Sequence, residues 1–360
     1  MQFVLVDADL ARTVTVELFE SVGFDSDVAG TVADVQIEAD RRGMHSHGLR
    51  AIPMYLERAR LGIVNGRPRM RVEATARAAV VVHGDAGPGQ AVAHRAMSEA
   101  IARAKQFGFG IAVARNSNHL GAVGYYANMA VEHGLIGFAT TNGNVMLPAP
   151  GAVEPVVGNN PLAWGIPAGN EPPLLFDVAT SVVAGGKIDL AAAEGDAIPA
   201  GWGVDGQGNP TTDAAAAAAG GLAIPLGAPA APYKGFGLAM VLEALAGVLA
   251  GARFGRQHTI EVEQGPRPWD EGHFFLAFDP AMVMPIDEFK RRMDELARDV
   301  RGSTPREPGQ TPRLPGQAGY ERRERALREG LRLPRSVYER LERAIERQGT
   351  ATKLRSAPAS

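Results

Sequence analysis

The 360-residue sequence predicts an α/β fold, with a central sheet domain between helical N- and C-terminal segments. Three observations support this prediction. Apolar side chains recur at helical spacing in residues 8–41 and again in 320–347. From about residue 78, short β-rich runs alternate with helical patterns. The length and the hydrophobic fraction of 45% suit more than one hydrophobic core.

The predicted helical N-terminal segment covers residues 1–75, and we expect it to pack with the C-terminal segment. A first helix is expected over 8–22, where apolar residues share one face. A second begins after Asp25, which offers an N-cap carboxylate, and runs to Arg41. A third helix is expected around residues 52–56.

The predicted central α/β domain covers residues 76–255. One of its helices carries Met97, Ala100, Ile101 and Ala104, which share a face at i, i+3, i+4 and i+7. Short β-rich runs, rich in branched and aromatic residues, predict strands at 78–82, 110–114, 135–141 and 174–178.

The composition of the chain predicts its loops and the boundaries of its C-terminal segment. Residues 210–231 are rich in Ala, Gly and Pro and predict a loop or linker, and 302–318 predicts an extended loop. A C-terminal α/β and helical segment is expected over 256–348, with helices at 320–330 and 335–347. The tail, 349–360, is predicted to be disordered.

The composition excludes several kinds of partner and several kinds of site. Lys plus Arg (37) nearly balance Asp plus Glu (40), so we expect neither a nucleic-acid nor a membrane partner. The absence of cysteine excludes disulfides, thiolate metal sites and cysteine nucleophiles. The N-terminus lacks the pattern of a signal peptide, which predicts a cytoplasmic protein. The apolar stretch Gly235–Gly255 carries Glu243 and predicts a buried helix rather than a membrane span.

A first polar and glycine-rich cluster spans Asp40 to Arg50. Its His47 titrates near neutrality and can donate a proton to a carbonyl oxygen that is being reduced. The adjacent Ser46 hydroxyl can relay or orient that proton, and Arg50 can hold a carboxylate. A solvated turn between helices, capped by the serine, explains the same residues equally well.

A second cluster, around His119, follows a predicted strand and precedes a predicted helix. Loops at strand carboxyl ends are where α/β proteins bind ligands. Two asparagines, a serine and two glycines flank this histidine, which favours a functional over a structural role.

A third cluster places Lys234 at the start of the apolar helix. A cation is locally unfavourable there, because the helix dipole puts positive potential at that end. An anion shared by Lys234 and backbone amides would resolve the conflict, although a solvated surface lysine is the simpler alternative. The usual G-x-G-x-x-G and G-x-x-x-x-G-K-[ST] nucleotide-binding motifs are missing.

Taken in this order, the clusters resemble the type 2 malate/L-lactate dehydrogenase family, which includes sulfolactate, ureidoglycolate and diketogulonate dehydrogenases. The resemblance covers about residues 10–345. The matching pieces are Arg42-Gly43, Ser46-His47-Gly48, Asn116–Gly121, Gly158–Ala163, Asp177–Ser181, Gly201-Trp202, Tyr233–Leu238, Gly272–Phe275 and Leu314–Gly316.

The resemblance implies a family-specific, non-Rossmann NAD(P)-binding α/β domain, which explains the missing motifs. It implies NAD or NADP as cofactor, a small-molecule substrate, a homodimer and no metal. His119 matches a proton acceptor, and Ser46 with His47 match a proton-relay pair. Cofactor contacts are implied for His119, Leu120, Gly121, Ala122, Val123, Asn142, Gly143, Asp177, Val178, Ala179, Lys234, Arg313, Leu314, Pro315 and Gly316.

Three residues depart from the family pattern. Ala51 stands where many members have a substrate-binding arginine, which leaves the neighbouring Arg50 as the expected carboxylate ligand. Asn159 replaces a threonine that contacts substrate in the cyclic imino-acid reductases of the family. Gly143 replaces a serine near the cofactor. We therefore expect Arg50 and Asn159 to bind substrate, and the identity of the acid stays open.

The predicted function is hydride transfer between a nicotinamide cofactor and a small 2-oxo or 2-hydroxy acid. One alternative is a cyclic imino-acid reductase of the same family. Another is a metal-dependent hydrolase that uses His45 and His47, although no second ligand cluster follows downstream. A third is a catalytically inactive relative that acts as a binding module.

Overall fold

The computed structural model describes residues 2–258 and 269–358. Its centre is a seven-stranded mixed sheet, and within it only β3 and β4 run parallel. In spatial order the strands are β2 (Arg71–Ala76), β3 (Ala79–His83), β4 (Phe109–Ser117), β12 (Glu271–Phe278), β5 (Ile136–Thr141), β8 (Leu162–Ile166) and β9 (Leu174–Val178).

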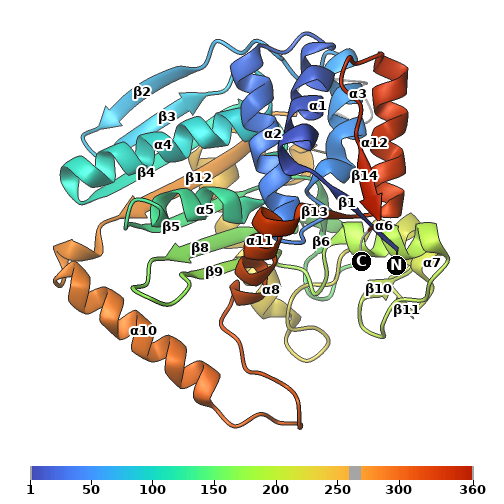
Figure 1. The fold of residues 1–360 in the computed structure, drawn as a ribbon. Helices are drawn as coiled ribbons and strands as arrows, with labels where there is room; N and C mark the ends of the chain where they lie inside the picture. Colours follow the sequence, from blue (N-terminus) through green and yellow to red (C-terminus); the bar gives the residue numbers. More distant parts are fainter. Residues whose placement is uncertain (1, 259–268, 359–360) are drawn as a thin grey trace.

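Helices cover both faces of this sheet (Figure 1). On one face, α4 (Gly89–Phe107) and α5 (Val123–Val131) enclose a core that includes Met97, Tyr126 and Phe275. Behind the sheet lie α8 (Pro232–Glu243) and the π-helical turn η2 (Ala244–Leu249), with a second core around Leu242 and Phe274. The sheet is thus buried on both faces, as in α/β proteins generally.

The two ends of the chain form one helical unit beside the sheet (Figure 1). Residues from both ends share a core that includes Leu18, Ile52, Leu333 and Leu341. A small sheet with the order β13-β1-β14 ties the ends together. The elements are β1 (Phe3–Val6), α1 (Ala8–Glu20), α2 (Ser26–Arg41), η1 (Leu49–Ala51), α3 (Ile52–Arg60), β13 (Leu331–Pro334), α12 (Arg335–Gln348) and β14 (Ser356–Pro358).

Short elements connect these units. Helix α10 projects away from the sheet, and a long loop leads from it to α11, which lies against α2 (Figure 1). The remaining elements are β6 (Val145–Pro148), β7 (Pro155–Gly158), α6 (Gly185–Glu194), β10 (Gly203–Val204), β11 (Pro210–Thr211), α7 (Ala214–Gly220), η3 (Gly255–His258), η4 (Pro280–Met282), α10 (Ile286–Gly302) and α11 (Gln317–Glu329).

Most predicted elements are confirmed, but the strand at the middle of the sheet, β12, was not predicted. Nearly all of its residues are buried, so it lacks the polar alternation that marks a strand with one face in water. The predicted boundary between residues 255 and 256 therefore does not coincide with a break in the sheet. It separates β12 from its neighbours β4 and β5.

Two predictions about irregular segments are wrong in part. Within 210–231, Ala214–Gly220 forms α7, because Asp213 caps its first turn by accepting bonds from two backbone amides. In the tail, Ser356–Pro358 forms β14 against β1, and Leu354 is buried, so residues 349–358 are not a disordered extension. Residues 359–360 lie outside the described part of the chain.

The apolar helix is less buried than we predicted. Side chains on one face of it, such as Tyr233 (64% exposed), Val241 (56%) and Leu249 (60%), face outward. By length and composition, Pro232–Leu249 is the one helix among the described residues that could cross a membrane, which is weak evidence. Its Glu243 is 4% exposed and accepts a 2.6 Å bond from Asn160 Nδ2, so that side of the helix is packed into the protein.

Candidate active site

The loop between α2 and η1 holds Ser46 and His47. It is positioned by Asp40, whose buried carboxylate accepts bonds from Leu49 N at 2.8 Å and from His45 Nδ1 at 2.7 Å. Within the loop, Ser46 Oγ lies 2.8 Å from His47 Nδ1. The serine and the histidine are therefore paired as the sequence predicted.

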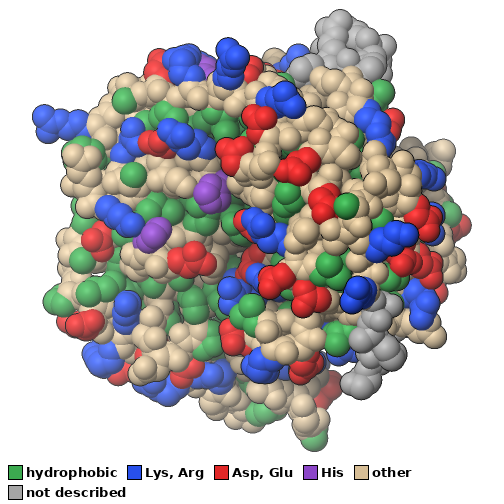
Figure 2. Space-filling model, turned by 45° about the horizontal axis from the view of Figure 1, so that its top comes forward, with side chains coloured by type: hydrophobic (Ala, Val, Ile, Leu, Met, Phe, Trp, Pro, Cys, Tyr) green, Lys and Arg blue, Asp and Glu red, His purple; other side chains and the backbone are tan. Residues whose placement is uncertain are grey.

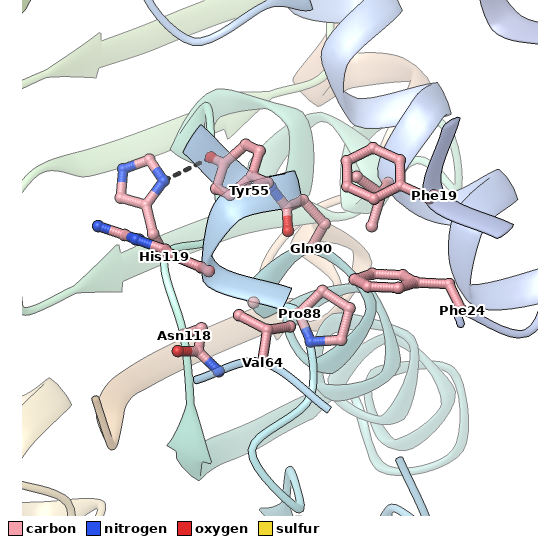
Figure 3. Close-up of a pocket in the computed structure, with 11 residues that line it drawn as sticks. Phe19, Phe24, Tyr55, Val64, Pro88, Gln90, Asn118 and His119 are labelled. Atoms are coloured by element: carbon pink, nitrogen blue, oxygen red, sulfur yellow. Dashed lines mark hydrogen bonds between the residues drawn. The ribbon is translucent and has the colours of Figure 1, made fainter. Parts of the chain in front are cut away.

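His119 lies in the loop between β4 and α5, as predicted. Its Nδ1 is 2.6 Å from the hydroxyl of Tyr55, which comes from α3 (Figure 3). The loop is fixed to the neighbouring chain, because Asn118 Nδ2 donates to Ala86 O at 2.9 Å and to Gly87 O at 3.0 Å.

The two histidines meet between the helical unit and the sheet. Their rings stack with centroids 5.8 Å apart and an interplanar angle of 19°. Burial, together with the charges that His47 and Arg58 can carry, lowers the pKa of His119 to about 3. The pKa of His47 is also lowered, mainly by burial and then by Arg50. Both imidazoles are neutral at physiological pH in the free protein.

The sequence did not single out Tyr55, Arg58 or Glu271. Tyr55 bonds to His119, the charge of Arg58 acts on His119, and Glu271 interacts with Arg58. The Arg58 guanidinium lies 3.7 Å from the Trp269 ring centroid, and its buried Nη1 has no hydrogen-bond partner within residues 2–258 and 269–358. Glu271 is 1% exposed, and burial raises the pKa of its carboxyl group to about 8, although Arg58 opposes the shift. No local pattern marks these residues, because two lie on α3 and the third lies at the start of β12, and only tertiary packing brings them together.

Two predicted substrate-binding residues, Arg50 and Asn159, converge on the segment 181–186. Arg50 Nη1 lies 3.5 Å from Gly186 O, and a Cβ on Gly186 would meet both Arg50 and Ser46 at 3.4 Å. Asn159 Nδ2 lies 3.5 Å from Ser181 Oγ. Both contacts are at the limit of hydrogen-bonding distance, so both side chains can turn toward a ligand.

Three predicted cofactor segments lie side by side. Asp177 Oδ2 accepts a 2.8 Å bond from Gly124 N, which joins 177–179 to the segment 119–123 before α5. Leu175 N donates to Pro315 O at 3.3 Å, which places 313–316 against the same strand. Burial raises the pKa of Asp177 to about 6, although the bond from Gly124 opposes the shift.

Two buried oxygens near these segments fit a nicotinamide nucleotide. Asn118 Oδ1 and Thr180 Oγ1 have no hydrogen-bond partner among the described residues, and they adjoin the segments 119–123 and 177–179. Buried polar atoms are usually paired. The carboxamide and ribose hydroxyls of the cofactor are donors of the kind that these oxygens lack.

The other predicted cofactor residues differ in their surroundings. Asn142 is buried, donates to Arg253 O at 2.6 Å and accepts from Gly272 N at 2.9 Å, so its own bonds lie within the fold. Next to it, Gly143 has open space where a side chain would be. Lys234 is exposed at the start of α8, and its neighbour Gly235 is linked by backbone bonds through Leu226 to Thr180.

The two histidines of the hydrolase alternative have separate partners. His45 bonds to Asp40, whereas His47 bonds to Ser46 and stacks on His119. Among the described residues, no group of three or more His, Cys, Asp and Glu side chains could hold a metal ion.

Comparison with known proteins places these features in one family. The family model described as malate/L-lactate dehydrogenase matches residues 6–342. The chain is 33% identical over 350 residues to a malate dehydrogenase of Pyrococcus horikoshii, which covers 96% of each chain.

Relatives with named cofactors are similar as well. The ureidoglycolate dehydrogenase (NAD(+)) of Escherichia coli K12 is 33% identical over 89% of each chain. A (2R)-3-sulfolactate dehydrogenase (NADP(+)) of Chromohalobacter salexigens is 36% identical over 75% of this chain and 80% of its own. The crystal structure of malate dehydrogenase from Entamoeba histolytica superimposes with a TM-score of 0.92 at 27% identity, over 97% of this chain and 99% of that one.

Proposed function

The chain belongs to the malate/L-lactate dehydrogenase family, and from this membership we propose an active site built around His47 and His119. The protein is an NAD(P)-dependent oxidoreductase that transfers hydride between nicotinamide and a small 2-oxo or 2-hydroxy acid. The observation that carries the proposed site is the stacking of the two imidazoles, each with its own hydroxyl partner.

His119 is the proposed proton acceptor when a 2-hydroxy acid is oxidised. Its lowered pKa keeps the ring neutral, so that a lone pair is available for the substrate hydroxyl. The Tyr55 bond engages Nδ1 and leaves Nε2 for the proton. In the opposite direction, the substrate carboxylate would raise the pKa of the neighbouring imidazoles and favour the protonated acid.

Arg50 and Asn159 are the proposed substrate ligands. Arg50 has no carboxylate within ion-pair distance among the described residues, so its guanidinium is available for the carboxylate of the substrate. The side-chain amide of Asn159, which lies at the other end of the segment 181–186, can bond to the other oxygen-bearing group of the substrate. Ser46 would relay the proton of His47.

The proposed cofactor contacts are the segments 119–123, 177–179 and 313–316, together with Asn142, Gly143 and Lys234. Bound nicotinamide supplies the hydride acceptor or donor. The chain would orient the nicotinamide. The bond between Gly124 N and Asp177 Oδ2 holds the loop with His119 next to the proposed cofactor segment 177–179. The helical unit contributes Tyr55, whose ring lies 6.0 Å from that of His119.

We also propose a homodimer. Pro232–Leu249 carries exposed large apolar side chains such as Tyr233, Val241 and Leu249, and a second copy of the chain is the occupant that family membership favours. Sedimentation at micromolar concentration should give twice the 38.0 kDa chain mass, and Val241→Lys should shift it toward the monomer. A cytoplasmic location stays a prediction.

The test of the function is a panel of 2-oxo acids and cyclic imines against NADH and NADPH, followed at 340 nm. We expect oxidation of at least one reduced cofactor with a 2-oxo acid, and loss of that activity in His119→Ala. Activity confined to cyclic imines would support the reductase alternative, and no activity with any pair would support the inactive relative.

A further inference from the structure

A cavity lies beside the loop that carries Ser46 and His47, and Gly43 and His45 of this loop line it. Its volume is about 330 Å³, at the lower end of the range of small-molecule sites, ~300–1,000 Å³. It is bounded by the end of α2, by α11 and by the strands β1 and β13, which lie together in Figure 1. Its walls are Phe3, Asp40, Arg41, Gly43, His45, Arg322, Arg325, Ala326, Gly330 and Arg332.

The side chains that line this cavity are mainly positively charged. Four arginines line it, and Asp40 is its one acidic residue. The Asp40 carboxylate is fully buried, and its two oxygens already accept bonds from His45 and Leu49. It is therefore poorly placed to neutralise the guanidinium groups at the mouth.

The arginines have few anionic partners of their own. Among the described residues, no carboxylate lies within ion-pair distance of Arg322, Arg325 or Arg332. Arg41 lies 3.8 Å from Glu38, but that carboxylate already accepts 2.8 Å bonds from two other arginines. Figure 2 shows one face of the molecule, on which acidic and basic side chains are interspersed.

Contacts with neighbouring groups hold two of the guanidinium groups in place. Arg332 stacks over the Phe3 ring at 5.1 Å, and Arg322 Nη1 lies 3.5 Å from Arg42 O. Gly43, which has a positive φ of 78°, leaves room for the Arg322 side chain beneath the loop. Guanidinium groups held side by side repel one another unless an anion lies between them.

We propose that this cavity binds the phosphate group of a small metabolite. Arginine is the side chain best suited to phosphate, because its planar fork donates two parallel hydrogen bonds to two oxygens. His45, whose Nδ1 bonds to Asp40, also lines the cavity. The cavity shares no lining residue with the proposed cofactor segments, and Gly43 and His45 of the loop that holds Ser46 and His47 line it.

The test is calorimetric titration of the full chain with inorganic pyrophosphate at low salt, with NADH or NADPH at saturation. One site per chain is expected. The double variant Arg325→Gln/Arg332→Gln should weaken binding about tenfold or more, since each change removes a charged hydrogen-bond donor. Arg328→Gln is the control for Arg325→Gln, because it makes the same change on α11 without lining the cavity.

Each outcome decides the proposal. Binding that the double variant weakens and the control leaves unchanged supports it. No measurable binding, or equal weakening in Arg328→Gln, overturns it in favour of general surface charge. Binding that appears only without cofactor shows that pyrophosphate occupies the cofactor's own phosphate site, which also overturns it. Both variants carry exposed substitutions, and a thermal melt checks that they fold.

Discussion

The two halves of the proposed site are held in place by different means. The loop 43–50, from the helical unit, depends on one buried carboxylate, Asp40, and on the absence of a side chain at Gly48, where a Cβ would overlap that carboxylate. The loop around His119 grows out of the central sheet. There His273, fully buried in β12, bridges Ser117 Oγ and Thr141 Oγ1 at 2.8 Å each.

From this difference we expect the sheet-borne half to determine most of the proton transfer and the helix-borne half to determine most of the substrate binding. The sheet-borne half is anchored on three adjacent strands, so His119 has a fixed position relative to the cofactor segments. The helix-borne half brings His47, Arg50 and Tyr55 over it. We expect the largest loss of turnover on the sheet side, at His119, and the largest loss of substrate affinity on the helical side, at Arg50.

The largest expected effect concerns the histidines. His119→Ala should lower kcat by ~10²-fold or more, because no other group replaces the proton acceptor, whereas cofactor affinity should change much less. His47→Ala should also lower kcat, and the comparison of the two rates identifies the main acid/base group. Steady-state kinetics with separate cofactor titration measures both. Turnover close to that of the unchanged protein in both variants would exclude histidine catalysis.

Arg50→Ala tests the helical half. The substrate carboxylate loses its proposed guanidinium partner, so KM should rise by roughly 30-fold, about 2 kcal/mol, with kcat less affected. Monocarboxylic acids should be preferred over dicarboxylic ones, since Ala51 provides no second cation. Arg60→Ala, on the exposed surface of α3, is the control. An unchanged KM, or better activity on oxaloacetate than on pyruvate-like acids, argues against this role.

The sequence predicted each half separately but not their contact. Motif order and spacing placed His47 on a helix–helix turn and His119 after a strand, and the structure has both there. The stacking of their rings depends on how the helical unit packs against the sheet. That packing involves residues far apart in the chain, which local periodicity does not encode.

The missed residues show the same limit. Glu271 lies on β12, which is buried on both faces and shows no alternation of apolar and polar residues. Tyr55 fits the pattern of apolar residues in a predicted helix, so nothing marked it as a site residue. Lys234 was predicted from a local conflict with the helix dipole, and it does lie at the start of α8. Its exposure depends on tertiary packing, so the sequence could not decide between a cofactor ligand and a surface lysine.

Glu271→Gln tests the electrostatics of the sheet side. Between pH 4.5 and about 8 the folded protein keeps a proton on Glu271 that the unfolded chain has lost, so stability from this group falls as pH rises through that window. Glutamine does not titrate and removes this decline. Relative to the unchanged protein, the variant should gain on the order of 2 kcal/mol in free energy of unfolding between pH 5 and pH 8. Urea denaturation at both values measures it, and parallel pH profiles would contradict it.

Tyr55→Phe tests the bridge between the halves. It removes the 2.6 Å bond to His119 Nδ1 and keeps the ring packing. Turnover should fall about fivefold to tenfold, the cost of one hydrogen bond of ~1–1.5 kcal/mol. For oxidation of the hydroxy acid, kcat/KM of the unchanged protein should stay flat from pH 8 to pH 5, because the lowered pKa keeps His119 deprotonated. An acid limb near pH 6.5 would show that the base has an ordinary pKa.

The smallest effect is expected outside both halves, at Lys234. Its side chain is exposed, so it loses little hydration on binding a cofactor phosphate, and water screens the charge. Lys234→Ala should therefore weaken NAD(P) binding by ~1 kcal/mol, about fivefold, rather than by the larger amount that a buried charge pair contributes. Stability without cofactor should hold or rise slightly, because a cation leaves the positive end of the α8 dipole. Lys187→Ala, on the first turn of α6, makes the same change at another helix start and should leave cofactor affinity unchanged. If both variants bind cofactor as the unchanged protein does, Lys234 is a surface lysine and the cofactor phosphates lie closer to the segments 119–123 and 313–316.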